Sequence, residues 1–141
     1  MKLFKWTNSY SVYIPEIDAE HQALFRMIAD LQREIVSGAP AGRIQAMLHE
    51  TITHIAAHFA HEERRMTATH CPYYRWHKKQ HDTATRTVLG LERRIRGGDG
   101  EAPLELIEFF AGWLRGHINL TDRMMAAHLR ACGRHNAALA S

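Results

Sequence analysis

The stretch HKKQHDTATRTVLGLERRI, residues 77–95, carries its imidazole and apolar side chains at steps of three or four residues. Such steps bring side chains onto one face of an α-helix. Pro72 precedes the stretch and Gly97-Gly98 follows it, as expected when proline opens a helix and glycine ends it. The stretch therefore predicts an amphipathic helix over about residues 73–96. Its inward face consists of His77, His81, Ala84, Val88, Leu91 and Ile95.

Three further segments, residues 18–38, 41–69 and 104–132, repeat this helical spacing. The connections between the four segments are short, which favours antiparallel neighbours. No window of β-branched residues alternates as a strand would. We therefore predict an all-α fold, an antiparallel up-down-up-down four-helix bundle with an N-terminal arm.

The ends of these helices are predicted from capping residues and helix breakers. Asp18 is expected to be the N-cap of the first helix, and Gly38 to end it. Pro40 and Pro103 are expected to open the second and fourth helices, and Gly133 to close the fourth.

The chain of 141 residues is expected to form a single domain, with an arm over 1–17, a bundle over about 18–133 and a short tail. It has no run of about 18 apolar residues and no signal sequence, which predicts a cytoplasmic protein without membrane insertion. Cys71 and Cys132 are expected to be free thiols. The net charge of +3 comes without a basic stripe interleaved with aromatic residues, so no nucleic-acid partner is predicted. The arm is expected to pack through Trp6, Tyr10 and Tyr13.

Each predicted helix places at least one histidine on its inward face. An unpaired polar group in such a core costs several kcal/mol, so these side chains need a common partner. A shared metal centre would satisfy all of them together. The polar residues on the inward faces are His21, His58, Glu62, His77, His81 and His117.

Asp122 is a further candidate ligand, five residues beyond His117. Five residues correspond to about 140° around an ideal α-helix, which fits a single face badly. We therefore predict either a local π-type widening of the helix near Leu120 or a flank-on approach by Asp122.

The candidate ligands amount to five imidazoles and two carboxylates. That number exceeds the four ligands of one tetrahedral zinc ion, but it fits two six-coordinate ions bridged by the carboxylates. Nitrogen and oxygen donors without thiolate suit iron or manganese and do not exclude zinc.

Four motifs of the chain resemble those of the hemerythrin family. IDAEHQALF resembles D-x-E-H-Q-x-L-F, and HFAHEERRM resembles H-F-x-x-E-E-x-x-M. CPYYRWHKKQH resembles the stretch in which a proline precedes H-x-x-x-H, and WLRGHINLTD resembles W-L-x-x-H-I-x-x-x-D. The resemblance covers the chain from about Trp6 to Arg123, and all seven ligand positions hold the expected residue type.

The resemblance implies a non-haem di-iron centre, bridged by an oxo or hydroxo group, that binds dioxygen reversibly. It implies three histidines on one iron, two on the other and two bridging carboxylates, so that the second iron keeps an open position for dioxygen. The first iron would be bound by His77, His81 and His117, and the second by His21 and His58. The bridging carboxylates would be Glu62 and Asp122.

Apolar residues next to the ligands are expected to keep water and protons away from bound dioxygen. The candidates for this lining are Leu24, Phe59, Trp113, Leu114 and Ile118.

The leading hypothesis is an oxygen carrier, not an enzyme, for storage, delivery or buffering of dioxygen. Its expected partners are dioxygen and an oxygen-consuming enzyme, and its expected state is a monomer. The alternatives are a di-iron oxidase or peroxide-handling enzyme, and an oxygen or redox sensor.

Two residues near the ligands have no assigned role. His61, beside Glu62, is interpreted as a surface histidine, although its position would also allow it to support a ligand from outside. Glu63 matches the second glutamate of the family motif, which is not a ligand there, and its role is left open.

Overall fold

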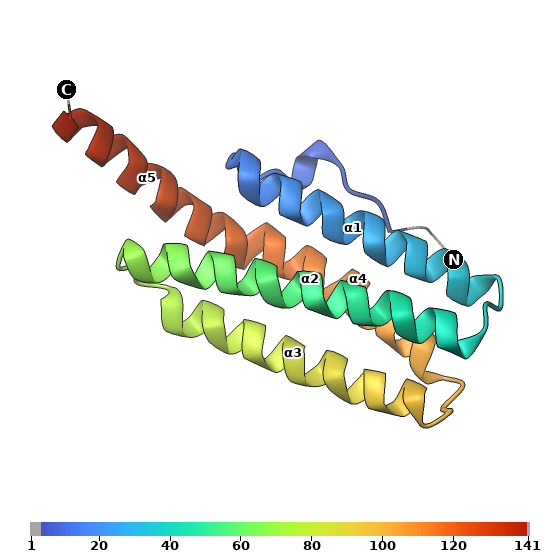
Figure 1. Cartoon of the computed structure of the whole chain (residues 1–141). Helices are drawn as coiled ribbons and strands as arrows, with labels where there is room; N and C mark the ends of the chain where they lie inside the picture. The colour runs from blue at the N-terminus through green and yellow to red at the C-terminus, as the bar shows by residue number, and fades with distance from the viewer. Residues whose placement is uncertain (1–3, 141) are drawn as a thin grey trace.

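The structure, a computed structural model, describes residues 4–140 and the side chains of residues 4–137. Helices α1 (Pro15–Val36), α2 (Ala41–Ala68) and α3 (Tyr74–Arg96) lie side by side with a fourth, longer helix (Figure 1). The fourth helix consists of three successive elements, α4 (Ala102–Gly116), the π-helical segment η2 (His117–Asp122) and α5 (Arg123–Ala140). Residues 4–140 contain no β-strand, and the predicted all-α four-helix bundle is confirmed.

Each helix packs against two neighbours, which closes the bundle. Helix α1 contacts α2 and α4, and α3 contacts the same two helices. Short connections reverse the chain between consecutive helices, giving the predicted up-down-up-down order (Figure 1). The buried face of α3 consists of the six residues that the spacing predicts. None of the described helices is long and apolar enough to cross a membrane.

Glycines end α1 and α3 as predicted. Gly38 and Gly98, which follow these helices, have φ angles of +78° and +86°, a conformation that L side chains rarely adopt. The prediction for Asp18 is wrong, because α1 begins earlier, with Pro15 in its first turn. Asp18 instead accepts hydrogen bonds from the Ser11 hydroxyl (2.6 Å) and the Val12 N–H (2.9 Å), which tie the arm to α1.

The predicted end of the fourth helix at Gly133 is also wrong, because α5 continues to Ala140. A glycine inside a helix costs only about 1 kcal/mol, and no proline follows to stop the helix. The last turns of α5 extend beyond the ends of α1 and α2, and most residues from 131 to 137 are exposed (Figure 1).

The predicted widening of the fourth helix is confirmed. The six residues of η2 form a π-helix in which His117 and Asp122 are both buried. Hydrogen bonds in a π-helix span five residues, so residues five apart approach the same face. Leu120 lies on the opposite side, 57% exposed.

The arm covers α1 with apolar side chains. The ring of Phe4 stacks on that of Phe25 with 4.1 Å between centroids, and Tyr10 packs against the same ring at 5.1 Å. Trp6 is partly buried against the core, as expected. The expectation for Tyr13 is wrong, because its side chain is 72% exposed and contacts Arg130, whose guanidinium carbon lies 5.8 Å from the ring centroid.

Replacing Asp18 with alanine should release the arm, because the Ser11 hydroxyl and the Val12 N–H lose their charged acceptor. We expect a loss of about 1–3 kcal/mol in the free energy of unfolding, measured by urea denaturation. Asp30→Ala is the matched control, since its exposed pair with Arg33 contributes about 1 kcal/mol or less. Equal effects of the two substitutions would contradict the role given to Asp18.

Candidate metal centre

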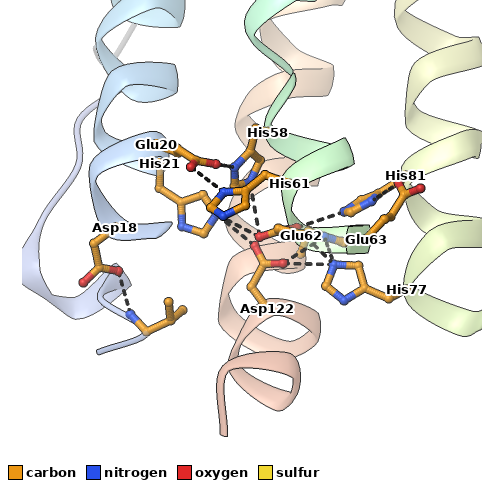
Figure 2. Close-up of polar contacts among 12 residues, drawn as sticks. Asp18, Glu20, His21, His58, His61, Glu62, Glu63, His77, His81 and Asp122 are labelled. Carbon is orange, nitrogen blue, oxygen red and sulfur yellow. Dashed lines mark hydrogen bonds and ion pairs between the residues drawn. The ribbon is translucent and has the colours of Figure 1, made fainter. Parts of the chain in front are cut away.

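All seven predicted ligands meet inside the bundle. His21 comes from α1, and His58 and Glu62 come from α2. His77 and His81 come from α3, and His117 and Asp122 come from η2. Each side chain is at most 4% exposed. Figure 2 shows the two carboxylates in the middle, with His21 on one side and the α3 histidines on the other.

The ligand atoms form two groups that share both carboxylates. Within each group the atoms lie within 4.8 Å of one another, so each group could hold one metal ion. The five-donor group is made of Glu62, His77, His81, His117 and Asp122, and the four-donor group is made of His21, His58, Glu62 and Asp122.

Asp122 directs one oxygen to each group. Its Oδ1 lies 3.1 Å from the Nε2 atoms of both His77 and His117, and its Oδ2 lies 3.1 Å from Nε2 of His21. This is the arrangement that a carboxylate bridging two cations requires.

Glu62 divides its oxygens in the same way. Its Oε1 lies 3.3 Å from Nε2 of His77 and 3.1 Å from Nε2 of His81. Its Oε2 lies 3.3 Å from Nε2 of His58 and 3.7 Å from Nε2 of His21. Both carboxylates therefore face the five-donor group with one oxygen and the four-donor group with the other.

Hydrogen bonds do not satisfy these inward atoms. Both oxygens of Glu62 and of Asp122, and Nε2 of His81, are buried without a hydrogen-bond partner. The Nε2 atoms of His77 and His117 lie 3.0 Å apart, too close for two lone pairs without a proton or a cation between them. Since orphaned buried polar atoms are costly, the residues fit a pair of cations well.

The charges of the site favour bound cations. Burial lowers the pKa of His21, but the facing carboxylates of Asp122 and Glu62 outweigh it and raise that pKa to about 9. The same balance raises the pKa of His77 to about 9 and that of His58 to about 10. Burial raises the pKa of Glu62 and Asp122, yet the facing imidazoles hold both values well below the usual range. The carboxylates are thus ionised, and protons or metal ions must balance them.

Three residues outside the ligand set, Glu20, Glu63 and Gln80, accept hydrogen bonds from ligand imidazoles. These outer acceptors bind Nδ1–H of His58 (2.6 Å), of His81 (2.9 Å) and of His117 (2.9 Å), respectively. Carboxylate and amide oxygens only accept, so each Nδ1 carries a hydrogen, and in the neutral imidazole that binds a cation the lone pair lies on Nε2. The outer acceptors therefore present Nε2 of three imidazoles to the site.

Sequence reasoning missed Glu20 and Gln80 and left Glu63 without a role. Each outer acceptor is the immediate chain neighbour of a predicted ligand, which is the signal that could have identified it. A neighbour lies about 100° around the helix and so faces the next helix rather than the core. His61 also proves to be engaged, since its Nδ1 lies 2.6 Å from Oε2 of Glu20.

An apolar cavity of about 50 Å³ lies next to the histidines. Four of the five predicted lining residues border it, namely Leu24, Phe59, Trp113 and Leu114. Ile118 is fully buried but does not border the cavity. The ring of Phe59 stacks on His81 at 3.8 Å and that of Trp113 on His117 at 4.3 Å, so aromatic rings separate the cavity from the five-donor group.

These features define a class of protein, a four-helix bundle with two adjoining histidine–carboxylate cation sites in its interior. A sequence profile described as the Hemerythrin HHE cation binding domain matches residues 12–129, and the chain belongs to this family. The predicted resemblance is thereby confirmed, and the chain is a metal-binding protein of the hemerythrin type.

Individual relatives agree with this assignment. The bacteriohemerythrin of Stenotrophomonas maltophilia (strain R551-3) is 26% identical over 131 residues, which cover 93% of this chain and 84% of that protein. The myohemerythrin of Riftia pachyptila is 30% identical over 121 residues, covering 84% of this chain and 88% of that protein. Two crystal structures of hemerythrin variants share the fold, with a TM-score of 0.84, 24% identity and coverage of 92% of this chain and 98% of theirs.

Removing one imidazole from the five-donor group should remove one cation. We expect His77→Ala, loaded with ferrous iron without oxygen, to hold one iron per chain where the unmodified protein holds two, by elemental analysis. His49→Ala, an exposed histidine on α2, is the control and should hold two. Retention of two irons by His77→Ala would contradict the ligand assignment.

Proposed function

We propose that the chain binds dioxygen reversibly at a di-iron centre and serves oxygen storage, delivery or local buffering. The observation that carries this proposal is that the two groups contain different numbers of ligands. Both share the bridging carboxylates, but one adds three imidazoles and the other only two. With an oxo or hydroxo bridge shared between the two ions, a six-coordinate ion in the five-donor group would be complete, whereas one in the four-donor group would keep one position open to a small external ligand.

The donor set favours iron and favours binding over activation. Imidazole and carboxylate donors without thiolate suit iron. Five imidazoles and two carboxylates leave the site less negative than the ferritin-like di-iron sites, which use four carboxylates and two histidines. Fewer anionic donors stabilise high-valent iron less.

The residues around the site support a carrier rather than an enzyme. The outer acceptors occupy the Nδ1–H groups of three ligands, and both buried carboxylates would serve as bridges. The chain therefore dedicates these groups to holding the cations rather than to transferring protons to a substrate. Ferrous ions, when bound, would supply the electrons that bind dioxygen.

The cavity beside the site is suited to a small apolar ligand. Its lining is apolar, and apolar cavities of this kind stay dry. Leu24 and Leu114 lie on two different helices that face it, so both α1 and α4 help to exclude water. Dry surroundings would slow the loss of an oxygenated centre to ferric iron.

Anaerobic loading with ferrous iron followed by admission of oxygen tests the function. We expect a visible charge-transfer band that appears with oxygen, disappears under vacuum and returns on re-exposure, at two irons per chain. Direct conversion to the ferric form, with consumption of a reductant, would contradict a carrier and favour the alternative of a di-iron oxidase.

A polar side chain in the lining should shorten the life of the oxygenated protein. Leu114 is 4% exposed and one turn before His117, so Leu114→Asn would bury an amide and admit water. We expect unchanged iron content, about 1–3 kcal/mol lower stability and faster autoxidation, followed by the decay of the visible band.

Leu104→Asn, at a site on the same helix that is 42% exposed, is the matched control. It should change neither stability nor autoxidation. An autoxidation rate of Leu114→Asn equal to that of the control would show that the lining does not protect the centre.

A further inference from the structure

The outer acceptors follow a regular pattern around the bundle. Glu20 on α1 supports a ligand on α2, Glu63 on α2 supports a ligand on α3, and Gln80 on α3 supports a ligand on η2. The Nδ1 atoms of the other two ligands, His21 and His77, are buried without a hydrogen-bond partner. The outer acceptors are therefore unevenly divided between the two cation sites.

The four-donor group depends on a single outer acceptor. Of its two imidazoles, His58 is held by Glu20 and His21 has no partner at Nδ1. The five-donor group has two outer acceptors for its three imidazoles, a carboxylate and an amide. The amide oxygen of Gln80 is itself fixed by a hydrogen bond from the Thr121 hydroxyl at 2.8 Å.

The two outer carboxylates also differ in their surroundings. Glu63 lies 3.9 Å from the ammonium group of Lys78, which offsets part of its charge. Among the described residues, the ion-pair partners of Glu20 are instead two imidazoles, His58 on one oxygen and His61 on the other, each at 2.6 Å. Both oxygens of Glu20 are thus fixed by side chains of α2.

His61 extends the hydrogen bonds of Glu20 beyond His58. The side chain of His58 is 2% exposed, whereas those of Glu20 and His61 are 27% and 26% exposed. Consecutive hydrogen bonds therefore connect a buried ligand to two partly exposed side chains (Figure 2). His61 binds the second oxygen of Glu20 and so fixes the carboxylate that accepts the hydrogen bond from His58.

We propose that Glu20, held by His61, is the positioning residue of the four-donor cation. It fixes Nε2 of His58 toward that cation and increases the electron-donating power of the imidazole, whereas Glu63 and Gln80 act on the five-donor cation. The inference rests on the two-cation site of the proposed function and not on dioxygen binding.

Zinc retention tests the assignment, because zinc is redox-inert and the result does not depend on oxygen chemistry. The variants are Glu20→Ala and Glu63→Ala, with Glu50→Ala, an exposed glutamate of α2, as control. Each zinc-loaded protein is titrated with a competing chelator, and anomalous diffraction locates the zinc that remains.

We expect Glu20→Ala to bind the zinc beside His21 and His58 about 10–100-fold more weakly and to keep the other zinc. Glu63→Ala should show the reverse, and His61→Ala should weaken the same zinc as Glu20→Ala, but less. Loss of the five-donor zinc from Glu20→Ala, or equal weakening of both zincs in both variants, would overturn the inference.

A second readout separates electron donation from packing. Glu20→Gln keeps an acceptor for Nδ1–H, as Gln80 does for His117, but removes the charge. With iron bound, this variant should retain both ions and have a higher reduction potential, because a less basic imidazole stabilises ferric iron less. An unchanged potential would reduce Glu20 to a structural role and contradict the proposal.

Discussion

Two ionised carboxylates in the middle of an apolar bundle set the main constraint on this structure. Taking a carboxylate out of water costs several kcal/mol unless positive charge faces it. Glu62 and Asp122 are fully buried, and each is surrounded by imidazoles from its own helix and from two others. The carboxylates are stable only when all four helices are in register, because each helix contributes at least one of the facing side chains. The centre therefore couples the longitudinal positions of the helices to one another.

The π-helical segment follows from this constraint. In a regular α-helix, Asp122 would lie about 140° from His117 and could not face the same cluster. The widened turn of η2 returns both side chains to the interior, and the exposed position of Leu120 shows where the extra residue is accommodated. Helix α5 then resumes with Met125 fully buried, so the departure from α-geometry is confined to the site.

The sequence predicts those features that depend on spacing along one helix. The buried face of α3 and six of the seven inward polar residues are of this kind, because period and burial determine them together. The spacing alone does not place Asp122, which reaches the cluster through the π-helical turn. The role of Asp18 could not be predicted, since it depends on how the arm packs against α1. The position of Glu20 beside His21 marks it as a candidate, but its partner His58 depends on which helix packs against α1. The prediction at Gly133 failed for another reason: a glycine inside a helix costs only about 1 kcal/mol, and no proline supports a helix end there.

The arrangement of the outer acceptors makes the orientation of each ligand imidazole depend on how the helices pack. A residue next to a ligand in the chain is turned about 100° away from it, toward the adjoining helix. Glu20, Glu63 and Gln80 each use that direction to hold an imidazole on the following helix. A shift of one helix would thus disturb both its own ligand and the orientation of the next. Because the hydrogen bond at Nδ1 decides which ring nitrogen carries the lone pair, correct packing of the helices and correct chemistry of the ligands become the same condition.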